Sequence, residues 1–281
     1  MRFIKQLFGF YVNGSVHVAL SVFSLTWITL IEHRAPYDKN LLCFVFFATI
    51  VGYNFVKYFG LAKFHYRGLV LPKAMQKLKS IKVFSFFCFM CMVYFAFGLH
   101  INTLACILVF GAITFFYAIP FLPKHFFVDA QQNLRSISGL KIYLIALVWC
   151  GVTVFLPIVN QQYNISVDLV LTGIQRYVFI WVLMLPFEIR DLRYDSLKLS
   201  TIPQKIGVRQ TRVLGVLLLA GCFFVDFFKV GTATSNTIVL LIIAVITGGF
   251  LVGSKVGQKP YYSAFWVEAV PVLWLVLLLL S

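Results

Sequence analysis

The stretch VFIWVLMLPFEIRDLRYDS, residues 178–196, joins an apolar run directly to three carboxylates. The chain of 281 residues has only nine Asp and Glu against 24 Lys and Arg, so Glu188, Asp191 and Asp195 are a third of its acidic residues. On a helix these three lie at i, i+3 and i+7, which places them on one face. Like charges at this spacing repel one another and are costly to desolvate near a membrane, so something must compensate them.

Two kinds of compensation fit this spacing. Arg190 and Arg193 are expected on other faces of the helix, where they neutralise only the overall charge. A divalent cation is the first possibility, since Mg²⁺ takes oxygen ligands and usually binds through one or two carboxylates plus substrate phosphates. A solvated helix end with local salt bridges is the second. The spacing alone leaves both open.

Composition predicts a membrane protein. The chain is 61% hydrophobic and 12% charged, with a mean hydropathy of +0.92, whereas about a quarter of the residues in soluble domains are charged. Apolar runs of the length that crosses a ~30 Å hydrocarbon core recur along the sequence. Strands of a membrane barrel would show alternating segments, which are absent. We therefore predict an all-α, polytopic bundle of about nine transmembrane helices, near residues 10–31, 41–59, 81–99, 102–121, 141–159, 167–187, 212–230, 236–253 and 263–280.

The basic residues predict an orientation. Twenty of the 24 Lys and Arg fall in the N-terminal segment and in alternate connections, all on one side if nine spans alternate. By the positive-inside rule this side, with the N-terminus, is cytoplasmic and the C-terminus is outside. We expect a multi-pass protein of a bacterial inner membrane. Topology and attraction to anionic lipid headgroups explain the pI of about 9.7, so nucleic acid is not an expected partner.

Residues 188–207 read EIRDLRYDSLKLSTIPQKIG. This segment resembles the second aspartate-rich region of the UbiA superfamily of membrane prenyltransferases, in which D-x-x-D-x-x-x-D precedes a polar segment, a Thr-Leu/Ile-Pro turn and a Gly. Asp191 and Asp195 match the last two aspartates, and Glu188 replaces the first. The segment 201–203 and Gly207 match the tail. YAIPFLPK at 117–124 is similar to the Tyr-Pro-Lys-rich end of the family's fourth helix.

The resemblance implies a single integral-membrane domain over residues 1–281. It also implies transfer of an isoprenyl group from a prenyl diphosphate to an aromatic or lipid-soluble acceptor. Asp191 and Asp195 would be catalytic, and together with Glu188 they would hold Mg²⁺, as few as one ion. The metal neutralises the charge that develops on the leaving diphosphate.

The first aspartate-rich region of the family, N-D-x-x-D-x-x-x-D, is degenerate here. Asn54 matches the leading asparagine, but Phe55, Tyr58 and Ala62 occupy the aspartate positions. One hypothesis is a divergent transferase in which cations replace metals, and the other is a catalytically degenerate scaffold that binds a lipid or a partner protein. Under the first hypothesis the residues that contact the diphosphate are Asn54, Lys57, Tyr58, Lys124, Lys141 and Arg190.

A few polar residues lie inside the predicted spans. Arg176, Asp168 and Asp226 fall near span ends, where snorkelling to the interface is the expectation. Glu268 lies in the inner part of the last span, where it can pair with a Lys or Arg of the cytoplasmic side. His17 is expected to be a buried histidine with satisfied hydrogen bonds. Since the spans carry so little charge and no inverted repeat is evident, a transporter is the weaker alternative.

Overall fold

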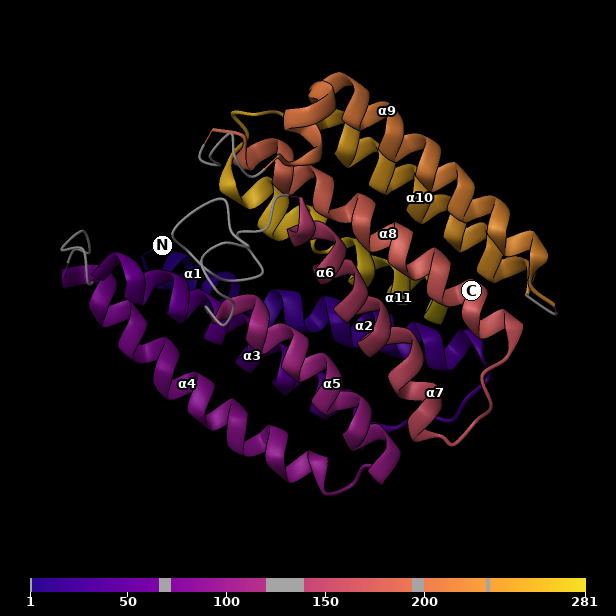
Figure 1. Cartoon of the computed structure of the whole chain (residues 1–281), viewed down its shortest axis with the longest axis horizontal. Helices are drawn as coiled ribbons and strands as arrows, with labels where there is room; N and C mark the ends of the chain where they lie inside the picture. Colours follow the sequence, from indigo (N-terminus) through magenta and orange to yellow (C-terminus); the bar gives the residue numbers. More distant parts are fainter. Residues whose placement is uncertain (1, 66–71, 120–138, 194–199, 231–232) are drawn as a thin grey trace, which may run out of the picture.

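The computed structural model describes residues 2–65, 72–119, 139–193, 200–230 and 233–281, and these segments form helices and turns without strands (Figure 1). The helices run along a common direction, which makes an elongated bundle. The predicted all-α class is confirmed. In chain order the elements are α1 (Arg2–Asn13), α2 (Val16–Glu32), α3 (Lys39–His65), α4 (Pro72–Ala96), α5 (Ile101–Ala118), α6 (Leu140–Cys150), η3 (Gly151–Phe155), α7 (Leu156–Asn160), α8 (Val167–Asp191), α9 (Ile202–Val225), η5 (Asp226–Phe228), α10 (Thr234–Gly253), η6 (Tyr262–Val267) and α11 (Val270–Leu280).

Most of the predicted apolar runs form helices long enough to cross a membrane. In the described part of the chain seven helical stretches qualify by length and composition, or eight if α1 and α2, bent by 53°, form one span. The run near 102–121 falls on a shorter apolar helix, Ile101–Tyr117. Each predicted run thus coincides with a helix, which fits an integral multi-pass protein. The single-domain assignment over 1–281 and the membrane type stay predictions.

Helix α8 lies at the centre of the bundle and α4 lies at its edge. Within the most apolar window of each helix, 61% of α8 is buried but only 6% of α4. A continuous hydrophobic cluster surrounds α8 and includes Phe179, Ile180 and Leu183 from α8 itself. The exposed apolar side chains of α4, such as Phe86 and Phe87, are those expected to face lipid.

Two spans contain π-helical turns that precede a proline. Pro157 follows η3 and Pro271 follows η6. Proline lacks the backbone N–H and its ring collides with the carbonyl four residues earlier, so the chain locally widens instead of breaking. Gly151 is the first residue of η3. A Cβ at this position would collide with the Phe110 ring of α5, so glycine allows the two helices to approach closely. These turns shape both spans without interrupting them.

The connections that carry most of the basic residues lie together. In Figure 1 the start of α1, the end of α3 with the start of α4, the end of α8 with the start of α9, and the α10–η6 turn lie at one end of the bundle, and the C-terminus lies at the other. We call the first the basic end and the second the opposite end. This arrangement agrees with the grouping that the charges predicted. Which end faces the cytoplasm stays a prediction.

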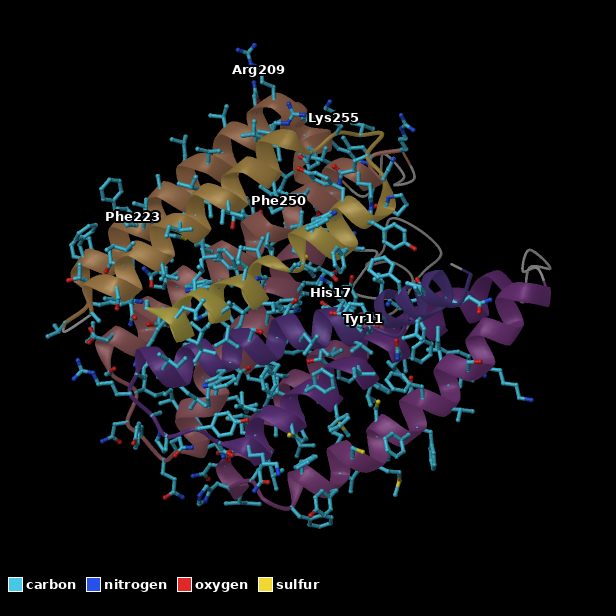
Figure 2. The ribbon with its side chains drawn as sticks, turned by 180° about the vertical axis from the view of Figure 1, so that it is seen from behind. Tyr11, His17, Arg209, Phe223, Phe250 and Lys255 are labelled. Atoms are coloured by element: carbon cyan, nitrogen blue, oxygen red, sulfur yellow. The ribbon has the colours of Figure 1, made fainter. Side chains whose placement is uncertain are left out.

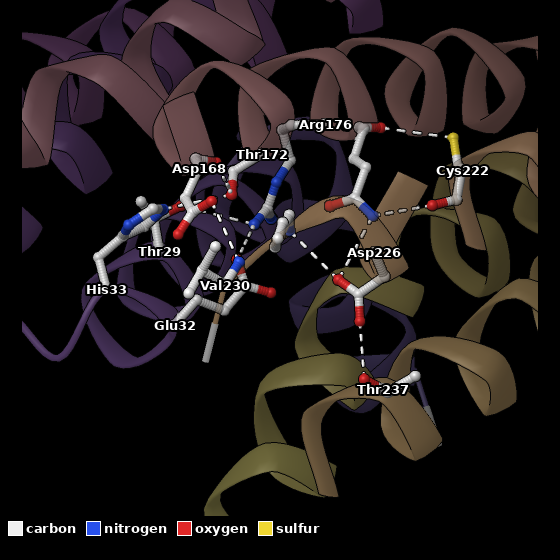
Figure 3. Close-up of polar contacts among 12 residues, drawn as sticks. Thr29, Glu32, His33, Asp168, Thr172, Arg176, Cys222, Asp226, Val230 and Thr237 are labelled. Atoms are coloured by element: carbon white, nitrogen blue, oxygen red, sulfur yellow. Dashed lines mark hydrogen bonds and ion pairs between the residues drawn. The ribbon is translucent and has the colours of Figure 1, made fainter. Parts of the chain in front are cut away.

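At the opposite end, the expected snorkelling of Arg176 is wrong. Its side chain is only 1% exposed and points into the bundle (Figure 3). Its Nη2 lies 3.5 Å from Glu32 Oε2 and 3.5 Å from Thr29 Oγ1, and the guanidinium lies 4.8 Å from the centre of the Trp274 ring. Arg176 is directed inward because α2 supplies a carboxylate and α11 an aromatic face.

Asp226 is also directed inward and not toward the interface. It is 5% exposed, and Lys229 Nζ lies 3.3 Å from its Oδ1. Its Oδ2 accepts a hydrogen bond from Thr237 Oγ1 at 2.7 Å, and its Oδ1 lies 3.4 Å from Gln175 Nε2 (Figure 3). Asp226 therefore ties α8 and α9 to α10. Asp168, in contrast, is only partly buried and lies in the first turn of α8.

A small polar cavity of about 50 Å³ opens between these groups. It has room for a few water molecules. Burial lowers the pKa of His33, which favours the neutral ring, and His33 Nε2 lies 3.2 Å from the Thr172 hydroxyl. The side chains that line the cavity include Glu32, His33, Asp168, Thr172, Asp226 and Lys229.

The buried ion pair gives a stability prediction. We expect Arg176→Met to destabilise the protein by about 3–5 kcal/mol, because the partly buried carboxylate of Glu32 is left without its cation and the contact with Trp274 is lost. The double variant Glu32→Gln with Arg176→Met should recover part of this loss. SDS-induced unfolding of the purified protein measures both. Arg209→Gln, at an exposed arginine of α9, is the control and should change stability by less than about 0.5 kcal/mol. Equal losses for the single and double variants would contradict a direct interaction.

The arrangement of the ends gives a topology prediction. In a variant without the six native cysteines, cysteines placed at the exposed positions Lys79 and Lys205 should react with a membrane-impermeant maleimide from the same side. A cysteine at exposed Gln162, at the opposite end, should react from the other side. By the positive-inside rule the first side is cytoplasmic. Labelling of positions 79 and 205 from different sides would show that the arrangement is wrong.

Candidate functional site

The acidic motif lies at the basic end of α8. Glu188 is buried, with 3% exposure, whereas Asp191 lies nearer the surface with a side chain 23% exposed. Arg190 Nε donates to Asp191 Oδ1 at 2.8 Å, and Lys141 Nζ lies 3.8 Å from Asp191 Oδ2. The helical face of Arg190 predicted that this residue neutralises only the overall charge. That prediction is wrong, because Arg190 contacts Asp191 directly. Its long side chain folds back onto the neighbouring carboxylate, and Asp191 joins α8 to the start of α6.

The tail of the motif packs against the start of α6. Gly139 precedes α6 with φ of 71°, and a Cβ at this position would lie 3.5 Å from the carbonyl oxygen of Ser200. Thr201 begins α9, and its backbone N–H donates to Gln204 Oε1 at 2.9 Å. Gly207 has φ of 81° within α9, a left-handed conformation that favours glycine. The Thr-Ile-Pro…Gly pattern thus forms the beginning of α9, beside the start of α6.

Asn54 holds the turn between α1 and α2. It is 3% exposed, and its Oδ1 accepts from Ser15 Oγ at 2.8 Å. Its Nδ2 donates to the Gly14 carbonyl at 3.1 Å and to Ser85 Oγ at 2.9 Å. Ser15 has φ of 65°, so these bonds stabilise a strained turn. Both amide hydrogens of Asn54 are therefore used inside the protein, and a contact with diphosphate stays a prediction.

Lys57 contacts the same turn from one helical turn farther along α3. Its Nζ donates to the Asn13 carbonyl at 3.1 Å and to Ser15 Oγ at 2.9 Å. An ammonium group has three hydrogens, so one donor remains after these bonds. Lys57 is exposed at its outer part. Tyr58, in contrast, faces α4, where Lys82 Nζ lies 3.1 Å from its hydroxyl and 4.1 Å from the ring centre.

Phe55, at the first of the positions where the resemblance predicts an aspartate, makes an aromatic contact. Phe55 stacks on Phe115 of α5 with ring centres 6.0 Å apart and an angle of 19° between the planes. An aspartate at this position would lie beside the Phe115 ring. Phe55 thus contributes to the packing between α3 and α5.

Glu268 was not among the predicted site residues, and its backbone lies beside α2. It follows η6 directly, and its backbone carbonyl accepts a hydrogen bond from Ser21 Oγ of α2. The charges of Lys57 on α3 and Arg190 on α8 both act on its carboxylate. The sequence suggested that Glu268 can pair with a basic residue of this side. It did not predict the π turn before Pro271, which sets the position of Glu268 in the last span.

Aromatic and hydroxyl groups surround the same region. The charge of Glu268 also acts on the Tyr11 and Tyr53 hydroxyls. Tyr53 OH accepts a hydrogen bond from Trp149 Nε1 at 2.9 Å, which links α3 to α6. Because this bond uses an acceptor site of the Tyr53 oxygen, the Tyr53 proton remains available for donation.

His17 fixes α1 and η6 to one another, as expected for a buried histidine with satisfied bonds (Figure 2). Its Nε2 lies 2.8 Å from the carbonyl oxygen of Phe265, and its Nδ1 lies 2.7 Å from Tyr11 OH. The carbonyl can only accept, so Nε2 carries the proton and Nδ1 accepts from Tyr11. Phe8 adds ring contacts with Tyr261 and Phe265.

Two predicted site residues, Asp195 and Lys124, lie outside the described residues. Within the described segments no group of three or more His, Cys, Asp and Glu is arranged to hold a metal ion. The donor chemistry of Glu188 and Asp191 nevertheless suits a hard cation such as Mg²⁺. Asp191 would have to exchange Lys141 or Arg190 for the metal.

A solved structure has the same overall architecture. It is described as giving insights into digeranylgeranylglyceryl phosphate synthase in membranes, and it matches with a TM-score of 0.56 over 96% of this chain and 92% of its own, at 14% sequence identity. No protein-family model and no curated protein matches the sequence. The chain has the fold of a UbiA-type membrane prenyltransferase.

The UbiA-type fold confirms in part what residues 188–207 suggested. At this low identity the likeness establishes the fold and leaves substrates and chemistry open. The motif that pointed to the UbiA-type fold lies at the end of its central helix, beside Lys141 and Arg190. The metal, the diphosphate contacts and membership of the superfamily remain predictions.

Proposed function

We propose that the protein is an integral-membrane prenyltransferase that moves an isoprenyl group from a prenyl diphosphate to an aromatic or lipid-soluble acceptor. The observation that carries this proposal is the UbiA-type fold, which extends over 96% of the chain. The acidic motif at the end of α8 and the basic groups beside it support the same chemistry.

The basic end offers fixed cations for an anionic substrate. Lys57 has one unused donor, and Lys141 and Arg190 share Asp191 as their counter-ion. A diphosphate can replace Asp191 as the partner of these two cations, because phosphate oxygens accept the same charge-assisted hydrogen bonds. Asn54 then acts by holding the α1–α2 turn against Lys57.

Mg²⁺ would supply the remaining positive charge. In this proposal Glu188, Asp191 and Asp195 hold the ion, which neutralises charge on the departing diphosphate. Asp191 has two roles in succession: it pairs with Lys141 and Arg190 in the free protein and turns to the metal when the diphosphate has taken these cations. One ion is sufficient for this arrangement, since the first aspartate-rich region is missing.

The alternative is a scaffold that has kept the fold and lost catalysis. The observation that favours it is the Phe55–Phe115 stack at a position where the family has an aspartate. Such a protein would bind a lipid or a partner protein at this end. Direct binding of prenyl diphosphates separates the two functions even before an acceptor is known.

The test is binding and transfer with purified protein in detergent. Farnesyl and geranylgeranyl diphosphates should bind with Mg²⁺, and part of the affinity should survive EDTA because Lys57, Lys141 and Arg190 remain charged. Lys57→Ala should weaken binding by about 1.5–3 kcal/mol through loss of a charged hydrogen bond. Asp191→Asn should remove the Mg²⁺-dependent part and leave the remainder unchanged or stronger, since it releases two cations.

Lys79→Ala is the matched control, because Lys79 is an exposed lysine of α4 at the same end. It should bind as the wild type does. Incubation with radiolabelled prenyl diphosphate and extracted membrane lipids then detects transfer to a lipid product. Absence of diphosphate binding, or binding that responds to neither Lys57 nor Mg²⁺, would support the scaffold instead.

A further inference from the structure

Helix α1 has an apolar side that the bundle covers only in part. In the second half of the helix, Phe8 packs against a ring of η6 and Phe10 against a ring of α4, with ring centres 5.1 Å apart in each pair. In the first half, Ile4 is 71% exposed and Leu7 is 56% exposed. The apolar side of α1 thus continues beyond the helices that cover it.

The other side of α1 is polar. Four residues recur at i, i+4, i+7 and i+11 and therefore share one face of the helix: Arg2, Gln6, Gly9 and Asn13. Gln6 and Asn13 are exposed. The helix also contains Lys5 and has no acidic residue. An apolar face opposite a polar face with basic residues is typical of a helix that lies at the boundary between lipid headgroups and acyl chains.

The uncovered side of α1 adjoins the surface of α4 that is expected to face lipid. Phe10 contacts Phe84, and the next apolar side chains along α4, Phe86 and Phe87, are exposed. Helix α1 is bent by 53° from α2, so it does not continue that span in a straight line. With 12 residues α1 is about 18 Å long, which is too short to cross a hydrocarbon core of ~30 Å by itself. A lipid surface is the occupant that suits both sides of this helix.

The end of α1 is bonded to residues of the proposed diphosphate site. Lys57 Nζ donates to the carbonyl of Asn13, the last residue of α1, at 3.1 Å and to Ser15 Oγ at 2.9 Å. Asn54 bonds Gly14 and Ser15 of the same turn. The position of α1 therefore determines where two acceptors of the Lys57 ammonium group lie.

We propose that α1 is an interfacial helix that docks on the phospholipid headgroup layer and thereby holds Lys57 in position for a diphosphate. Ile4 and Leu7 lie among the upper acyl chains, and the polar face lies toward water. The basic residues of α1 add attraction to anionic headgroups. When α1 leaves the surface, Lys57 keeps its charge but loses the fixed acceptors that orient it. The effect on diphosphate rests on the proposed function, whereas the docking does not.

Spin labels test the docking without any substrate. In the variant without the six native cysteines, single cysteines replace Ile4, Leu7, Gln6 or Asn13, and the labelled protein is placed in phospholipid nanodiscs. Labels at positions 4 and 7 should collide more often with oxygen, which concentrates among acyl chains, than with a water-soluble nickel chelate. Labels at positions 6 and 13 should show the reverse. The same preference at all four positions, for oxygen or for nickel, overturns the docking.

Two further positions calibrate the labels. Phe86→Cys, at an exposed apolar residue of α4, is the reference for lipid. Gln162→Cys, at an exposed residue of the opposite end, is the reference for water.

Binding of farnesyl diphosphate in nanodiscs tests the coupling to Lys57. The double variant Ile4→Gln with Leu7→Gln should bind about tenfold more weakly than the wild type, as for the loss of one charged hydrogen bond. In a Lys57→Ala background the same double substitution should change the affinity by less than about twofold, because the group through which α1 acts is gone. Equal weakening in both backgrounds overturns the coupling. Val83→Gln with Phe86→Gln, at two exposed apolar positions of α4, is the matched control and should bind as the wild type does.

Deuterium exchange measures the coupling even when no ligand binds. In the double variant of α1 the amides of the turn at residues 13–15 should exchange faster than in the wild type, and in the α4 control they should not. Unchanged exchange overturns the link between docking and this turn. If the wild type binds no prenyl diphosphate, the proposed function fails, while the spin labels and the exchange still decide the docking. If the wild type binds it and the α1 variant binds equally well, the coupling is overturned and the proposed function stands.

Discussion

Helix α8 carries charged side chains near both of its ends and still lies at the centre of an apolar bundle, and this constraint shapes the helices around it. A buried charge is costly unless it is paired and hydrogen-bonded. Arg176 therefore requires Glu32 from α2 and the Trp274 ring from α11. At the other end Asp191, whose side chain is 23% exposed, pairs with Arg190 of its own helix and lies 3.8 Å from Lys141, which joins the end of α8 to the start of α6. The charges of α8 thus account for part of its contacts with α2, α6 and α11.

The same bundle needs local irregularity to bring polar groups inward. In a membrane interior every backbone polar group needs a partner, so a helix is bent or widened and not simply interrupted. The π turn before Pro271 does this in the last span, and the turn at Ser15 does it between α1 and α2. Glu268 follows the first irregularity and Lys57 bonds the second. Both irregular segments lie where the polar groups of the basic end meet.

The sequence predicts the helices well because apolar runs of span length depend on local composition alone. It also predicts the turn at Thr201, whose residues are local. It fails for Arg176, because position near a span end does not tell whether a side chain faces lipid or a neighbouring helix. It fails for Arg190 because a helical-face argument ignores a long side chain that folds back. It does not place Glu268, because the contact that positions this residue joins it to Ser21 of α2, far away in the chain.

Charge balance at the basic end suggests why the proposed diphosphate site needs positive charge beyond that of its side chains. At this end Lys57, Lys141 and Arg190 carry three positive charges, and Glu188, Asp191 and Glu268 carry three negative charges when all six are ionised. A polyanion gains little from a neutral cluster unless positive charge is added with it. In the proposed function, a metal ion held by the α8 carboxylates would add such charge.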